Sequence, residues 1–175
     1  MRRSYVEVQL RVLLKKASDG NCSQALAGID ELGEMRESLP FTYSKFAGFM
    51  KESHFQYWVG VVENMCGSEK AAKRRWSKVS KSTLPPDSPD FVFPYLAAKR
   101  LGDPDATQRI SAALDQVKIT LPDVTPPAVL FARGALLMAQ GKGDEGADFL
   151  QKATRSKDPL IQYLSLATLA EASVK

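Results

Sequence analysis

A pattern that recurs after 74 residues constrains the fold of this chain more than any other feature. The stretches 55–85 and 129–159 align without a gap, and each has the pattern of two amphipathic helices joined by a glycine turn. Five aligned positions are identical: Gly60 and Gly134, Gly67 and Gly141, Lys78 and Lys152, Ser82 and Ser156, and Pro85 and Pro159. The members of every pair are 74 residues apart, as 134 is from 60. A spacing shared by all pairs indicates a repeat architecture.

The rest of the chain extends this pattern to four helical hairpins. Apolar residues at helical spacing predict hairpins at about 4–34, 54–82, 90–118 and 127–156, with turn glycines at Gly20, Gly67, Gly102 and Gly141. The stretch at about 37–51 does not fit the repeat and is predicted to be an insertion. A final helix is predicted at about 159–173, because proline suits a first helical turn. We therefore expect an all-α chain with a single repeat domain over residues 1–175.

The second and fourth hairpins resemble those of the tetratricopeptide repeat (TPR) family. Small residues in that family let the two helices of a hairpin approach closely, and a large residue fills the gap to the next hairpin. The residues at these places are Gly60, Ala72, Trp76 and Val79, with Pro85 one residue late, and then Leu130, Gly134, Gly146, Leu150, Ala153 and Pro159. The resemblance implies a right-handed TPR-like α-solenoid of about four hairpins plus a C-terminal helix. The order of segments also resembles the C-terminal TPR region of larger bacterial proteins of unknown function.

The resemblance also implies a binding surface, because the first helices of TPR hairpins line a concave groove. The residues at those positions are Tyr57, Val61, Asn64 and Met65, followed by Phe131, Ala135 and Met138. The family's carboxylate clamp for peptide C-termini needs Lys, Asn and Arg at such places, whereas this set is mostly apolar. An apolar groove suits an amphipathic helix or an extended apolar peptide. The first hypothesis is a non-catalytic protein-interaction or scaffolding module; the alternative is that these residues merely pack against neighbouring repeats or the insertion.

The second helix of the second hairpin carries the densest charge in the chain. Its basic residues are Lys70, Lys73, Arg74, Arg75, Lys78 and Lys81. They indicate either contact with nucleic acid or an acidic protein, or simply a solvated outer helix face. Only Trp76 lies among them as an aromatic residue, whereas a stacking platform for bases needs several. Nucleic acid is therefore the less favoured partner.

No residues of this sequence assemble into a recognisable catalytic or metal-binding motif. His54 is the single histidine, and we expect it to face solvent at the start of a helix. The glycine-rich stretch 141–146 contains two acidic residues, which would repel a phosphate group. We therefore expect no enzyme activity, no metal and no cofactor.

Cysteine content and the lack of a long apolar run bear on where the chain works. Cys22 and Cys66 are expected to be half-buried, reduced residues of the kind found in cytosolic proteins. Polar residues interrupt the apolar stretch near the N-terminus, so we expect a cytoplasmic protein, with export of a longer parent protein left open. The apolar helices near the two ends predict self-association through Leu160 to Ala170 or through Tyr5 to Val12.

Overall fold

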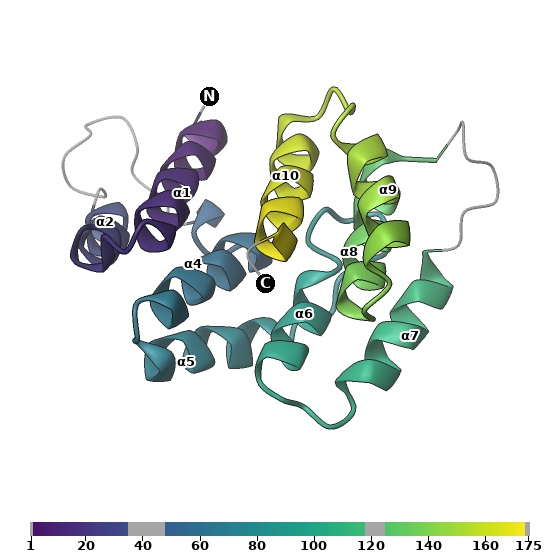
Figure 1. Cartoon of the computed structure of the whole chain (residues 1–175), viewed down its shortest axis with the longest axis horizontal. Coiled ribbons are helices and arrows are strands. Elements are labelled where there is room, and N and C mark those ends of the chain that lie inside the picture. The colour runs from purple at the N-terminus through teal and green to yellow at the C-terminus, as the bar shows by residue number, and fades with distance from the viewer. Residues whose placement is uncertain (1, 35–47, 118–124, 174–175) are drawn as a thin grey trace. The chain divides into compact units, whose positions relative to one another are not determined.

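The computed structural model describes residues 2–34, 48–117 and 125–173, and its regular secondary structure in these ranges is helical. Nine helices and no strand occur among the described residues (Figure 1), so the all-α prediction is confirmed. The predicted insertion lies outside the described residues except for its end, 48–51. The chain divides into two compact units, 1–79 and 80–175. Each unit is described separately below, and a single repeat domain over the whole chain stays a prediction.

The first unit contains two helical hairpins. α1 (Arg2–Ser18) and α2 (Cys22–Glu34) form the first hairpin, and α4 (Ser53–Met65) and α5 (Glu69–Val79) form the second. α4 packs against both α1 and α2, so the first helix of one hairpin contacts both helices of the hairpin before it. The apolar interior of this unit includes Leu10, Leu13, Ile29, Val59, Val62 and Trp76.

The second unit follows the same contact rule. α6 (Phe93–Arg100) pairs with α7 (Ala106–Gln116), and α8 (Pro127–Ala139) pairs with α9 (Gly143–Ala153). α8 contacts both α6 and α7, and the final helix α10 (Pro159–Ser173) contacts both α8 and α9 (Figure 1). α10 therefore takes the place that the first helix of another hairpin would take. The large apolar side chains in its first half are buried by this packing: Leu160, Ile161, Tyr163 and Leu164.

All four hairpins turn through the same hydrogen-bonded motif. A glycine with positive φ follows each first helix, with values of 79°, 77°, 70° and 85° along the chain. The backbone N–H after that glycine donates to the carbonyl five residues earlier: Asn21 to Lys16, Ser68 to Glu63, Asp103 to Ala98 and Lys142 to Leu137. This is the Schellman motif, in which glycine takes the left-handed conformation without a Cβ clash. The four predicted turn glycines are confirmed.

Close contact between paired helices depends on residues without a side chain. A Cβ added to Gly60 would lie 2.6 Å from Nε1 of Trp76, whose indole N–H donates to the Tyr57 carbonyl at 3.1 Å. A Cβ added to Gly134 would lie 2.9 Å from the carbonyl oxygen of Gly146 on the paired helix. The close approach expected at these glycines is confirmed, whereas the described contacts of Trp76 are with α4 of its own hairpin, and a role in filling the gap to the next hairpin stays a prediction. The 74-residue repeat in the sequence thus corresponds to two hairpins that are packed in the same way.

Candidate binding surface

The groove residues predicted in the first unit lie on α4, where two are buried in the interior of the unit and two are exposed at the end of the helix. Tyr57 and Val61 are buried, and the Tyr57 ring packs 5.3 Å from the Trp58 ring and 6.5 Å from the Trp76 ring, measured between centroids. Asn64 is exposed, and Met65 is 44% exposed in the last turn of the helix. Asn64 and Met65 are therefore the members of this set that a partner can reach without a rearrangement.

The groove residues predicted in the second unit lie on α8. Phe131 and Ala135 are buried, and the Phe131 ring lies 6.2 Å from the Phe93 ring of α6. Met138 is half-buried and close to α9, because a Cβ added to Gly146 would meet its Cγ at 2.8 Å. These apolar side chains occupy the interior in the described structure. Binding of a peptide in an apolar groove stays a prediction.

Four exposed basic residues of the second hairpin lie on the outer face of α5, and a fifth, Lys81, lies two residues beyond its end. We call Lys70, Lys73, Arg74, Lys78 and Lys81 the basic surface, and all five are exposed. The opposite face of α5 carries Ala72, Trp76 and Val79, which are buried in the first unit. Burial of this apolar face fixes the helix with its charged face outward, as expected for an amphipathic helix.

Three members of the basic surface form a straight row. Lys70, Arg74 and Lys78 are four residues apart, so their side chains lie on one line along the helix at intervals of about 6 Å. Lys73 is paired with Glu69 at 3.4 Å. Among the described residues, none of the three row members has an acidic partner within ion-pair distance. The row therefore presents three uncompensated positive charges.

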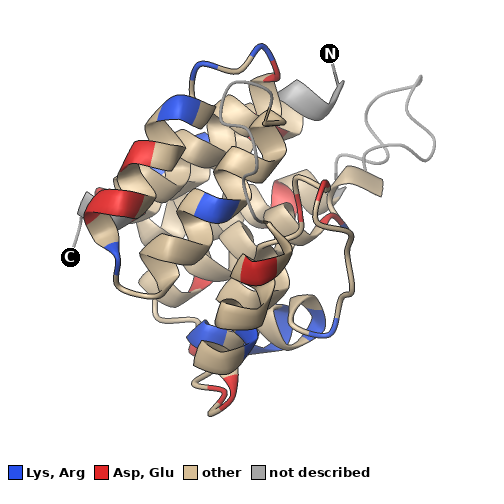
Figure 2. Cartoon of the chain, turned by 90° about the vertical axis from the view of Figure 1, so that its right-hand side faces the viewer, with Lys and Arg blue, Asp and Glu red and all other residues tan. Residues whose placement is uncertain are grey.

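The charge of α5 is out of proportion to the rest of the chain. Figure 2 shows Lys and Arg in blue and Asp and Glu in red, with both colours spread along the described ribbon. α5 has five basic residues and one acidic residue, which gives a net charge of +4. The whole 175-residue chain also has a net charge of +4, so the remainder is neutral in sum. The net positive charge of the sequence is thus equal to that of α5 alone.

Arg75 belongs to a different arrangement from its basic neighbours. Its Nε donates to Oε1 of Glu63 at 2.8 Å, and its Nη1 donates to Oε1 of Gln56 at 2.9 Å. Glu63 is buried on α4, so this ion pair ties the two helices of the hairpin together. This ion pair was not predicted from the sequence. A glutamate within the apolar stretch of α4 was the available signal, since a buried carboxylate needs a cationic partner.

His54 is buried, and the expectation that it faces solvent is wrong. It is only 2% exposed, with Nδ1 3.6 Å from Oε2 of Glu52. The chain that precedes α4 folds against its first turn, where the Gln56 side chain donates to the Met50 carbonyl. The described residues contain no group of three or more potential metal ligands.

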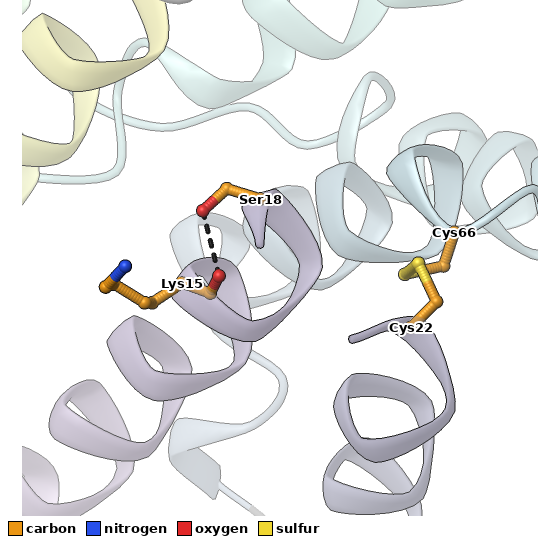
Figure 3. The surroundings of a disulfide bond; sticks show 4 residues. All are labelled: Lys15, Ser18, Cys22 and Cys66. Carbon is orange, nitrogen blue, oxygen red and sulfur yellow. Dashed lines mark hydrogen bonds between the residues drawn. A yellow bond between two sulfur atoms is a disulfide. The ribbon is translucent and has the colours of Figure 1, made fainter. Parts of the chain in front are cut away.

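The two cysteines form a disulfide bond, so the expectation that they are reduced is wrong. Cys22 is the first residue of α2 and Cys66 caps the end of α4, with their Cα atoms 5.2 Å apart (Figure 3). Both are half-buried, as expected. They meet because each flanks the turn of its own hairpin, and the two hairpins pack side by side. Residues 44 positions apart in sequence are thereby brought together.

The predicted self-association surfaces differ in exposure. On α1, Tyr5, Val8 and Val12 are exposed. On α10, Leu166 is 50% exposed, while the large apolar residues at the start of the helix are buried against its own unit. The part of the chain described by the structure has no helix that is long and apolar enough to cross a membrane.

Comparison of the chain with protein-family models, with curated proteins and with solved structures finds no match.

Proposed function

We propose that this chain is a non-catalytic binding module built from TPR-like helical hairpins. Three features support a repeat of this kind: the shared turn motif, the glycine-mediated packing within the second and fourth hairpins, and the contact of α4, α8 and α10 with both helices of the hairpin before each of them. Stacked hairpins present extended surfaces, and proteins of this architecture work by holding other molecules on those surfaces. A fold alone does not define a function, so the proposal depends on a particular surface.

The surface that we propose for binding is the basic surface of α5, and the partner is an acidic segment of another protein. The observation that carries the proposal is the row of Lys70, Arg74 and Lys78, which are exposed and have no acidic partner among the described residues. Like charges four residues apart on a helix repel each other. A partner with carboxylates at a similar spacing would form attractive ion pairs with the row. The positive charge of α5 would also attract such a partner as it approaches.

A protein partner agrees with the surface better than a nucleic acid does. Nonspecific binding to single strands uses exposed aromatic side chains on which bases stack. The aromatic residue of α5, Trp76, is 2% exposed and faces the interior, so the basic surface offers charge without a stacking partner. A helix with Glu at every fourth position presents carboxylates about 6 Å apart, which matches the pitch of the row.

Charge reversal tests the proposal. The probe is a synthetic helical peptide with Glu at every fourth position, and the test variant replaces Lys70, Arg74 and Lys78 with Glu. The control variant reverses Lys142, Arg155 and Lys157, which are exposed in the second unit, so both variants change the net charge equally. We expect the wild type and the control to bind the peptide at low salt and the test variant to lose binding.

Salt dependence and a second probe separate the alternatives. Binding to the basic surface weakens as salt rises, because counterions screen exposed charges. Binding of an apolar peptide by the predicted groove residues would be nearly independent of salt and unaffected by the charge reversal. A single-stranded oligonucleotide that binds more tightly than the peptide would assign α5 to nucleic acid instead. Equal loss of peptide binding in the test and control variants would refute the role of α5.

A further inference from the structure

The Cys22–Cys66 disulfide joins the turn regions of two neighbouring hairpins. Cys22 follows the residue whose N–H closes the first Schellman turn, and Cys66 precedes the glycine of the second turn. The Cα separation of 5.2 Å is within the range that disulfides adopt. Cys22 begins α2 and Cys66 directly follows α4, so these helices position the two cysteines beside each other (Figure 3). The sequence has two cysteines in all, so no other thiol of the chain competes for either.

The helix that this bond secures is short and buries few apolar side chains. α2 is 13 residues long, a length at which an isolated helix is marginal in water. Its buried apolar side chains are Ala25, Ile29 and Leu32, and the other described positions of α2 are exposed or half-buried. Its contacts are with α1 and α4. The disulfide sits at the first residue of α2 and fixes that end to α4.

We propose that the disulfide is a covalent clamp on α2 and that the chain works in an oxidising compartment, where the clamp stays closed. The bond forms by exchange with the disulfide of a thiol oxidoreductase. The Cys22 and Cys66 thiols each lose a hydrogen, their sulfur atoms join, and the two sulfur atoms of the oxidant leave as thiols. Reducing compartments keep such cysteines in the thiol form, whereas the periplasm, the secretory lumen and the cell exterior preserve the disulfide bond.

This inference favours the alternative of an exported parent protein over a cytoplasmic one. It is independent of the proposed partner, because neither cysteine belongs to the basic surface and neither test below requires a bound ligand. Reduction would free the start of α2 while leaving the Schellman turns and the α4–α5 packing in place. The clamp is therefore expected to control the mobility of α2 in particular.

The first test measures the thiol state in the cell that makes the protein. Free thiols are blocked with a maleimide at the moment of lysis, and the peptides that contain Cys22 and Cys66 are then identified by mass spectrometry. We expect the two peptides to be joined and unlabelled, and to accept label only after reduction. Recovery of both cysteines as maleimide adducts from the untreated cell would overturn the assignment of the compartment.

The second test measures amide hydrogen exchange in the purified full chain with and without a reductant. We expect reduction to accelerate exchange in α2 by at least about tenfold, because local opening limits exchange there. Amides of α8 and α9 serve as an internal reference and are expected to be unchanged. A variant with both cysteines replaced by serine is expected to exchange fast in α2 under both conditions. Unchanged exchange in α2 after complete reduction would overturn the clamp.

Discussion

Replacing Gly134 with Ala tests whether close helix packing defines the fourth hairpin. The new Cβ would lie 2.9 Å from the Gly146 carbonyl oxygen and 2.8 Å from Cγ of Leu150. Ordinary contacts begin at 3.4 Å, so α8 and α9 must separate by about half an ångström at their closest point. Overpacking of this kind costs about 1–3 kcal/mol, and the higher helix propensity of alanine offsets up to about 1 kcal/mol of it. We expect a net loss of about 1–2 kcal/mol.

Gly143→Ala is the matched control, because a Cβ at Gly143 meets nothing within 4 Å. It lies in the first turn of α9, where alanine is expected to be neutral or mildly stabilising. Urea unfolding followed by circular dichroism measures both variants, and a loss of 1–2 kcal/mol lowers the midpoint by about 1 M for a unit of this size. The chain's two tryptophans, Trp58 and Trp76, lie in the first unit, so their fluorescence reports on that unit separately. Equal midpoints for the two variants would refute the close approach of α8 and α9.

Three further substitutions have expected effects of different sign. Replacing both cysteines with serine opens a loop of 44 residues, and the chain-entropy relation predicts a loss of about 4 kcal/mol, measured as the urea midpoint of tryptophan fluorescence without a reductant; no shift would contradict a formed bond. Arg74→Glu converts two repulsions along α5 into attractions, so we expect the free chain to gain about 1 kcal/mol at low salt while peptide binding weakens. A loss of both stability and binding would instead give Arg74 a structural role. Glu63→Gln removes the charge opposite Arg75 and is expected to destabilise the first unit by about 1–2 kcal/mol, measured by the same fluorescence, with Glu69→Gln as a surface control.

The features of the fold that could be predicted from sequence are those fixed by local rules. A glycine with positive φ is needed wherever a Schellman turn follows a helix, so Gly20 and its counterparts mark the turns without knowledge of the rest of the fold. Gly60 on the first helix of the second hairpin has no side chain and so leaves room for the Trp76 indole on the second helix. Such relations extend over about 16 residues, as 76 is from 60, and a repeated spacing makes them visible.

The candidate site was harder to predict, because exposure depends on packing between distant segments. Tyr57 and Phe131 hold positions that face a groove in the TPR family, yet both are buried in this chain. Phe131 packs beside Phe93, 38 residues earlier, and nothing in the local sequence of α8 specifies that neighbour. The basic surface was predictable from α5 itself, since an amphipathic helix buries its apolar face.

The most informative wrong prediction was that Cys22 and Cys66 are reduced. Gly20 and Gly67 were predicted to be turn glycines of successive hairpins, but Cys22 and Cys66 were not considered as a pair. Equivalent turns of adjacent hairpins lie near each other, so a cysteine beside each turn is placed to form a bond. The alignment of successive hairpins thus predicts which distant residues lie close together, which composition and local pattern do not.

The disulfide also makes part of this chain a closed ring. The ring runs from Cys22 to Cys66 through α2 and α4, while α1 and α5 leave it as two tails. One peptide-bond cut inside the ring leaves a single covalent molecule, whereas one cut in either tail divides it into two. A protease that nicks the chain between these residues would therefore release no fragment until the bond is reduced. Covalent separation of the first two hairpins therefore requires both cleavage of a peptide bond between them and reduction of the disulfide.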